Sequence, residues 1–232
     1  MVCDVFSLSM SRLTLACGFN DSHIKLMSQN IKNRVLILFA HPAFQRSRVN
    51  RAMLRGLDSM PGITINDLYE QYPTLFIDVA REQELLEQHD VIILHHPFYW
   101  YSTPAILKEW QDLVLQHGWA YGREGRRLSG KYMLNAVTTG GPEPAYSAQG
   151  YNRFSLRQLL APMEQTAFLC RMNYLAPFVV HGTPLMKPEV VHQHASEYHR
   201  FLKALVADEL DLEKASEVER INKDLDSLVR GD

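Results

Sequence analysis

Polar and aromatic side chains that could hold a flat ring are concentrated in three short segments of the chain. The first segment, His41 to Asn50, follows a continuous apolar run. The second, Pro97 to Trp100, and the third, Thr138 to Gly141, each follow another apolar run. In an open α/β sheet, ligands bind at the carboxyl ends of the strands, where such loops meet. The second and third segments, at neighbouring strand ends, therefore suggest a slot for a planar redox cofactor.

The first of these loops could bind phosphate. Residues 47–50 are expected to begin a helix with Ser47 as its N-cap, and the free N–H groups of a helix start attract anions. Arg48 adds a positive charge there, and Asn50 adds a polar side chain. An ordinary capped helix explains the same residues. The phosphate interpretation therefore depends on the position of this loop after the central strand.

The second and third loops could hold the ring itself. Phe98, Tyr99 and Trp100 follow a proline at a strand end, and they could either wall a ring or belong to the core. The Gly140-Gly141 pair lets the backbone approach a ligand closely. Tyr146 lies just beyond, and its phenol could donate a proton or a hydrogen bond to a reduced oxygen. The alternative for Tyr146 is a surface side chain without a chemical role.

The elements that must position these loops alternate between strands and helices. Apolar runs predict buried strands at 34–40, 90–96, 131–139 and 173–181, and an alternating pattern predicts a strand nearer the edge at 64–69. Helical spacing predicts helices at 49–57, 81–89, from 103, at 155–170 with a kink at Pro162, and from 188. The fold class is therefore α/β, a doubly wound parallel sheet of five strands. A flavodoxin-like order 2-1-3-4-5 suits it better than a dinucleotide-binding order, because no G-x-G-x-x-G follows the first strand.

Composition excludes several classes of protein. The 232 residues are 46% hydrophobic and 22% charged, which allows a proper core and argues against global disorder. A net charge of −2 argues against nucleic-acid binding, and the basic cluster between Arg123 and Lys131 is interpreted as a solvated turn. The three cysteines form no C-x-x-C pair, so we expect a reducing cytoplasm and no metal site. No apolar run approaches the roughly 20 residues that a membrane-spanning helix needs.

Longer motifs carry a resemblance to a known family. The chain resembles the flavodoxin-like NAD(P)H:quinone oxidoreductases in L-I-L-F-A-H-P, H-P-F-Y-W-Y-S-T-P-A-I-L-K-E-W, H-G-W-A-Y and A-V-T-T-G-G. Within that family it is most similar to the bacterial ancillary subunits of the glutathione-regulated potassium-efflux (Kef) systems. That closer match is carried by L-Y-E-Q-Y-P-T-L-F-I-D-V-A-R-E-Q and C-R-M-N-Y-L-A-P. The resemblance covers about Arg34 to Leu205.

The resemblance implies a flavin, FMN rather than FAD, that is reduced by NAD(P)H and reoxidised by a quinone in the same slot. It implies that the flavin contacts His41, Ser47, Arg48, Val49, Asn50, Pro97, Phe98, Tyr99, Trp100, Thr138, Thr139, Gly140 and Gly141. It further implies that Tyr146 is catalytic, and Asn152 stands where the family has a partner histidine. Since a carboxamide cannot take up a proton as imidazole can, a mainly regulatory role becomes more credible.

The implied partners are a Kef-type potassium-efflux channel, a quinone and a second copy of the chain. The channel would place the protein at the cytoplasmic face of the inner membrane. The aromatic residues Trp110, Trp119 and Tyr121 predict an apolar homodimer interface. Two alternatives remain: a free-standing soluble quinone or nitro-compound reductase, and a flavodoxin-like electron carrier.

The chain is expected to have three parts. Residues 1–30 form an extension outside the family, 31–207 a flavodoxin-like flavin-binding domain, and 208–232 a charged tail that is helical or frayed. Leu13 to Cys17 faintly suggests a lipidation site, and a true translation start at Met27 is the favoured alternative.

Overall fold

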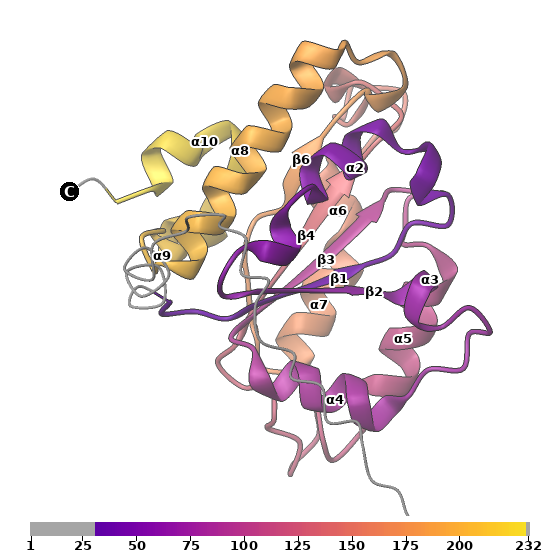
Figure 1. The fold of residues 1–232 in the computed structure, drawn as a ribbon, viewed down its shortest axis with the longest axis vertical. Helices are drawn as coiled ribbons and strands as arrows, with labels where there is room; N and C mark the ends of the chain where they lie inside the picture. The colour runs from indigo at the N-terminus through magenta and orange to yellow at the C-terminus, as the bar shows by residue number, and fades with distance from the viewer. Residues whose placement is uncertain (1–30, 231–232) are drawn as a thin grey trace, which may run out of the picture.

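A central parallel sheet carries the described part of the chain. The computed structural model describes residues 31–230, so the expectations for residues 1–30, including the lipidation site and the start at Met27, lie outside it. The strands lie in the order β2-β1-β3-β4-β5 (Figure 1), with β6 paired to β4. Their bounds are β1 Val35–Phe39, β2 Ile63–Asp67, β3 Val91–Pro97, β4 Tyr132–Thr138, β5 Asn173–Tyr174 and β6 Phe178–Val180. The predicted order 2-1-3-4-5 is confirmed.

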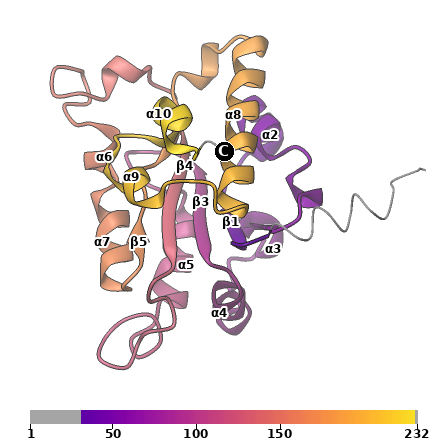
Figure 2. The same ribbon diagram turned by 90° about the vertical axis from the view of Figure 1, so that its left-hand side faces the viewer.

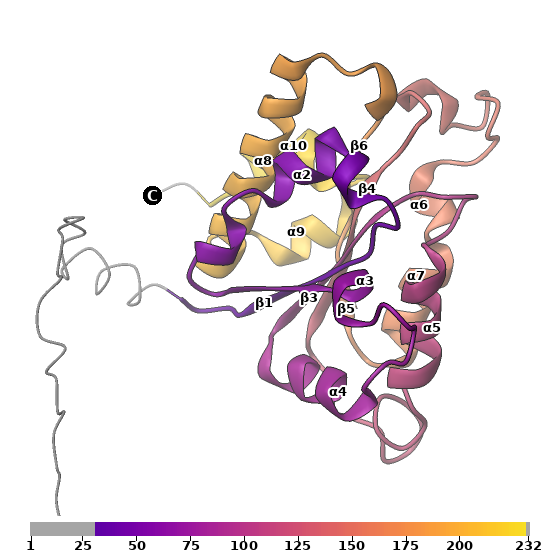
Figure 3. The same ribbon diagram turned by 45° about the vertical axis from the view of Figure 1, so that its right-hand side comes forward.

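Helices cover both faces of this sheet. One face carries α2 (Arg48–Leu54), α8 (Pro188–Val206), α9 (Leu212–Glu217) and α10 (Ile221–Leu228). The other carries α3 (Leu68–Gln71), α4 (Val79–Gln88), α5 (Ala105–Val114), α6 (Leu156–Leu159) and α7 (Ala161–Leu169), and Figure 3 shows the two groups separated by the strands. Short 3₁₀ helices complete the fold: η1 (Phe44–Arg46), η2 (Leu57–Ser59), η3 (Glu143–Ala145) and η4 (Thr183–Leu185).

The continuous apolar runs follow from this two-sided burial. In β1, Ile37 packs into the core under α2 and α8, whereas its neighbour Leu36 packs into the core under α4 and α5. Both side chains are fully buried, because successive side chains of a strand point to opposite faces. None of the helices within residues 31–230 is long and apolar enough to span a membrane.

Two predicted elements, one helix and one strand, are each divided into two shorter pieces. The predicted helix 155–170 is two helices, broken at Leu160, with Pro162 in the first turn of α7. The predicted strand 173–181 is also broken, because the Ala176 N–H donates to Ala215 O in α9 rather than to β4. Pro177, the next residue, has no N–H to offer the sheet. The fifth strand therefore consists of two short pieces, β5 and β6.

The segment beyond residue 208 is packed against the sheet in the described part of the chain. Ile221, Leu225 and Leu228 of α10 are buried in the same core as α8. Figure 2 shows α9 and α10 between the α6–α7 side of the molecule and α8. The side chain of Asn222 accepts from Val179 N at 3.0 Å and donates to Val179 O at 2.9 Å. These contacts cover the outer edge of β6.

Candidate functional site

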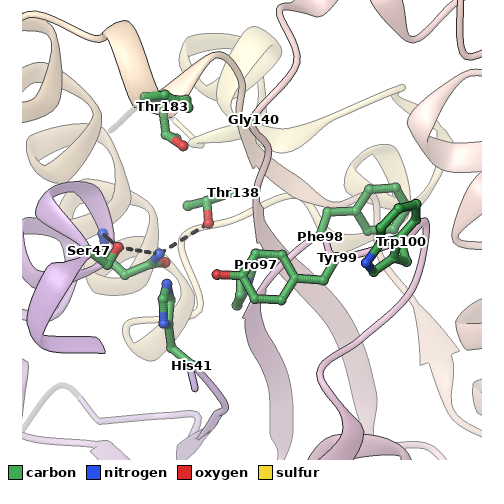
Figure 4. A pocket seen from close by; sticks show the side chains of 11 residues that line it. His41, Ser47, Pro97, Phe98, Tyr99, Trp100, Thr138, Gly140 and Thr183 are labelled. Atoms are coloured by element: carbon green, nitrogen blue, oxygen red, sulfur yellow. Dashed lines mark hydrogen bonds between the residues drawn. The ribbon is translucent and has the colours of Figure 1, made fainter. Parts of the chain in front are cut away.

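A cavity of about 560 Å³ opens at the carboxyl ends of β1, β3 and β4. It is lined by His41, Ser47, Asn50, Pro97, Phe98, Tyr99, Trp100, Thr138, Gly140, Thr183 and Pro184. Its volume lies within the range of small-molecule sites, roughly 300–1,000 Å³. The three loops predicted from the sequence therefore do meet around one cavity (Figure 4).

Asn50 is the centre of the polar side of this cavity. Its Nδ2 donates to Ser47 Oγ at 2.8 Å and to Thr138 Oγ1 at 3.1 Å, while its Oδ1 faces His95 Nε2 at 2.9 Å. Because a carbonyl oxygen only accepts, His95 carries its proton on Nε2, and its Nδ1 accepts from the Tyr198 hydroxyl at 3.2 Å. Complete burial lowers the pKa of His95 to about 3, so the ring is neutral. A chain of hydrogen bonds thus runs from α8 through β3 to the cavity.

His96 serves the aromatic loop in a similar way. Its Nδ1 donates to Pro97 O at 3.0 Å, and its Nε2 accepts from Asn135 Nδ2 at 2.9 Å. The Tyr174 hydroxyl donates to Asn135 Oδ1 at 2.7 Å, which fixes the orientation of that amide. Burial lowers the pKa of His96 to about 4. Sequence reasoning missed both histidines as site residues, although two imidazoles inside an apolar strand were a signal that polar partners lie nearby.

The aromatic loop presents its side chains in an unusual backbone conformation. Trp100 and Tyr101 have φ values of 48° and 62°, in the left-handed region that non-glycine residues avoid at a cost of roughly 1–2 kcal/mol each. Tyr99 and Ser102 close this turn with two backbone hydrogen bonds of 3.2 and 3.0 Å. In Figure 4 the Tyr99 hydroxyl points toward His41, Ser47 and Thr138, while Phe98 and Trp100 lie on the opposite side. The Trp100 side chain is 94% exposed at the mouth of the cavity.

Some predicted contact residues do not line the cavity: Arg48, Val49, Thr139 and Gly141. The guanidinium of Arg48 donates to Pro184 O at 3.3 Å and Met186 O at 3.0 Å, and the Val49 side chain is buried in the core. Conversely, Thr183 and Pro184 line the cavity but were missed. Their signal was their position just after the fifth strand, because that strand ends at the same edge of the sheet.

Tyr146 is not among the residues that line the cavity, but its ring lies beside Gly141, the neighbour of the lining residue Gly140. Its ring centroid is 6.3 Å from that of Phe98 and 5.2 Å from that of His181. Burial raises the pKa of Tyr146, with hydrogen bonding to Thr139 and Asn152 acting in the opposite direction. Asn152, which the family comparison singled out, accepts from the Tyr101 hydroxyl at 3.3 Å. Asn152 N donates to Ala145 O at 3.1 Å, so Asn152 lies in the same folded loop as Tyr146, and the pairing of the two in catalysis stays a prediction.

His181 was not foreseen as a neighbour of Tyr146. Thr139 Oγ1 donates to Gly141 O at 2.8 Å, so at 3.1 Å it accepts from His181 Nδ1. Burial lowers the pKa of His181 to about 4, and the ring is neutral. An imidazole thus stands beside Tyr146, but it comes from the end of β6 and not from position 152.

The aromatic residues predicted at a dimer interface pack mainly inside this subunit. Trp110 is 2% exposed, and its Nε1 donates to the buried carboxylate of Glu82 at 2.8 Å. Trp119 and Tyr121 pack, partly buried, against the same core. The prediction that Trp110 forms an interface is wrong, because its indole satisfies an acid that is itself buried.

Comparison with known proteins agrees with this geometry. Residues 33–202 match the family model described as flavodoxin-like fold. A relative from Serratia proteamaculans (strain 568), named glutathione-regulated potassium-efflux system ancillary protein KefG, is 46% identical over 170 residues, covering 73% of this chain and 93% of the relative. The chain therefore belongs to the flavodoxin-like family, in the group that contains these KefG proteins. The resemblance and the fold class predicted from the sequence are confirmed.

Two solved structures are similar over most of their length. General stress protein 14 from Treponema denticola, in complex with FMN, is 38% identical with a TM-score of 0.71, covering 74% of this chain and 99% of that one. An NADPH-quinone reductase from P. pentosaceus is 32% identical with a TM-score of 0.66, covering 72% of this chain and 96% of that one.

Proposed function

We propose that this chain is a regulatory ancillary subunit of a Kef-type potassium-efflux system that binds FMN and reduces quinones with NAD(P)H. The observation that carries the proposal is the cavity itself, in which three loops of the family domain converge. The names of the KefG relative, the FMN complex and the quinone reductase support the same function.

The cavity residues fit FMN. The start of α2 offers the Ser47 hydroxyl and backbone N–H groups toward a phosphate, whereas the guanidinium of Arg48 is bound to Pro184 O and Met186 O. Phe98, Tyr99 and Trp100 would flank the ring, and a Cβ built on Gly140 meets no atom within 4 Å, so the backbone there can approach a ligand. FMN would supply reversible hydride and electron transfer, which no side chain can perform.

The residues of the chain would bind, orient and protonate the substrate. Because one open cavity would serve both NAD(P)H and quinone, the two would react in turn. Tyr146 holds a proton on its hydroxyl at neutral pH, since burial raises its pKa, and it would donate a hydrogen bond to the quinone oxygen. Asn152 can accept a hydrogen bond but cannot carry a proton onward.

Exposed aromatic side chains suit the proposed homodimer. Trp100, which lines the cavity, and Tyr151 and Phe154, which lie in the loop before α6, are 94%, 73% and 52% exposed, and aromatic residues are enriched at interfaces. These residues replace Trp110 in the proposed interface. The Kef-type channel would hold the dimer at the cytoplasmic face of the inner membrane.

The purified full-length chain should show flavin absorbance bands, oxidise NADPH with a quinone, and co-purify with the channel from membranes. Tyr146→Phe should lower quinone turnover about tenfold, below the usual range for acid–base groups because the partner is Asn152, while the FMN content stays unchanged. Absence of flavin would refute the cofactor. Turnover without co-purification would favour the free-standing reductase, and flavin without turnover would favour the electron carrier.

A further inference from the structure

The C-terminal segment from Leu210 to Val229 contacts the loop that carries Tyr146, although it lies beyond the family match at residues 33–202. Arg220 Nη2 donates to Glu143 Oε1 at 2.7 Å. Glu143 begins η3, and its carbonyl oxygen accepts from Tyr146 N at 3.0 Å. One ion pair and one backbone hydrogen bond therefore link the C-terminal segment to Tyr146.

The same arginine lies at a small cavity that Tyr146 also lines. Arg220, Glu143, Tyr146 and His181 all line one small cavity of about 30 Å³. His181 packs on Tyr146, and the positive charge of Arg220 contributes to the lowered pKa of that histidine. Arg220 therefore contacts the η3 turn that holds the Tyr146 backbone, and it shares a cavity with the imidazole that packs on the Tyr146 ring.

The backbone on both sides of Arg220 is fixed by hydrogen bonds and burial. Ile221 N donates to Pro177 O at 2.9 Å, and the Ile221 side chain is fully buried. On the other side of it, Arg157 donates to Val218 O at 2.6 Å and Ser216 O at 2.8 Å. Because these contacts do not involve the Arg220 side chain, replacing the guanidinium should leave the segment in place.

This ion pair is buried on the arginine side only. The Arg220 side chain is 16% exposed and that of Glu143 is 57% exposed, and the hydrogen bond from Arg220 is the first cause of the lowered pKa of Glu143. By contrast, Arg200 and Asp226, which also join the segment to the rest of the fold, are 53% and 90% exposed. Exposed pairs contribute little, because water screens them.

We propose that Arg220 is a positioning residue for Tyr146. Its ion pair with Glu143 holds η3, and thereby keeps the phenol against His181 and toward the substrate. This inference rests on the proposed function for its catalytic readout, while the order of the loop can be measured without any activity.

The test compares Arg220→Gln with Arg200→Gln in the full chain loaded with FMN. Arg220→Gln should speed hydrogen exchange of the Tyr146 and Asn152 amides about fivefold, since both donate only within this loop. It should lower kcat for quinone by a similar factor, with little change in KM for NADPH and in FMN content. Arg200→Gln should do neither.

Two further variants test whether the contact with Glu143 is responsible. Arg220→Lys, which keeps the positive charge, should restore part of the loss. Adding Glu143→Gln to Arg220→Gln should cause no further loss, because the two residues act through one contact.

Unchanged exchange at both amides in Arg220→Gln would overturn the inference. Faster exchange throughout the chain, or loss of FMN together with turnover, would also overturn it, because Arg220 would then be a general structural residue. If the parent chain reduces no quinone, the proposed function fails, and the exchange measurement alone decides whether Arg220 orders the loop.

Discussion

Two sides of the site are built by different means. The strand-end side consists of His41, Ser47, Asn50 and Thr138, and its central Asn50 is 2% exposed and hydrogen-bonded through His95 to the core. The loop side consists of Tyr146, Tyr151 and Asn152, which lie in a long connection between β4 and α6. The first side lies at the ends of β1 and β4 and the start of α2, within the residues that match the family model. The second depends on contacts from His181 and Arg220, far along the chain.

The adjacent glycines 140 and 141 mark the boundary between the two sides. A Cβ on Gly140 would meet nothing within 4 Å and would enter the cavity. A Cβ on Gly141 would lie 2.8 Å from the Tyr151 hydroxyl and 3.3 Å from Tyr146 Cε2. Gly140 therefore faces the cavity, whereas the next residue, Gly141, faces the residues of the loop side.

The largest expected effect is the loss of stability in acid, caused by the two buried histidines beneath the strand-end side. His95 and His96 have pKa values of about 3 and about 4 in the folded protein, against about 6.5 when unfolded. The unfolded chain therefore binds more protons below pH 6.5, and stability falls as the pH drops from about 6.5 to about 4 for His96 and to about 3 for His95. From pH 7 to pH 5 these two rings together should lower the free energy of unfolding by about 4 kcal/mol.

Urea unfolding at pH 7, 6 and 5 measures this loss. His95→Gln should remove the His95 share of this loss, about 2 kcal/mol between pH 7 and pH 5, whatever it does to stability at pH 7, while His96 and His181 keep theirs. Equal stability of the parent protein at pH 7 and pH 5 would show that the two histidines are not buried neutral groups.

Asn50→Ala should give the next largest effect, on the cofactor. The change leaves His95 Nε2 and the Thr138 hydroxyl without this partner and leaves Ser47 Oγ only its cap bond from the backbone N of residue 50, so FMN affinity should fall about 100-fold. The matched control is Asn66→Ala, which removes a buried asparagine bound to Glu82 at 2.8 Å, away from the cavity. It should lower stability but leave the dissociation constant for FMN, measured by fluorescence quenching, unchanged. An equal loss of affinity in both variants would mean that general stability governs binding.

Substitutions at Gly140 and Gly141 should affect FMN affinity and quinone turnover separately. Gly140→Val should weaken FMN about tenfold, because the branched side chain takes up cavity space. Gly141→Ala should leave FMN affinity unchanged and lower quinone turnover about threefold, because its Cβ displaces Tyr151 and Tyr146. The two variants need FMN titration and steady-state kinetics side by side. If both lose FMN alike, the boundary between the sides lies elsewhere.

The smallest expected effect is a gain. Asn152→His would place an imidazole near Tyr146, where one with a pKa near 6.5 can accept or supply a proton at neutral pH. We expect quinone turnover to rise about threefold, with potassium efflux from cells that carry the channel unchanged. No gain would indicate that His181 or the pocket limits the chemistry. A loss of efflux would place the Asn152 loop in contact with the channel.

The sequence by itself determined the strands, the fold class and most of the strand-end side. Apolar runs such as 34–40 and 90–96 can be recognised without neighbours, because a strand buried on both faces needs apolar residues throughout. Once the strands are parallel, their carboxyl ends meet at one edge. The residues that follow them, His41, Asn50, Pro97 and Thr138, must then come together.

Only the tertiary structure decided the loop side and the fate of single side chains. The proximity of His181 to Tyr146, the reach of Arg220 to Glu143 and the turn of Arg48 toward Pro184 all join segments remote in sequence. Trp110 has the apolar character of an interface residue, yet it lies in the core because Glu82 is buried beside it. Local periodicity defines elements, whereas such contacts depend on how the elements pack, and packing places each side chain through all of its neighbours at once.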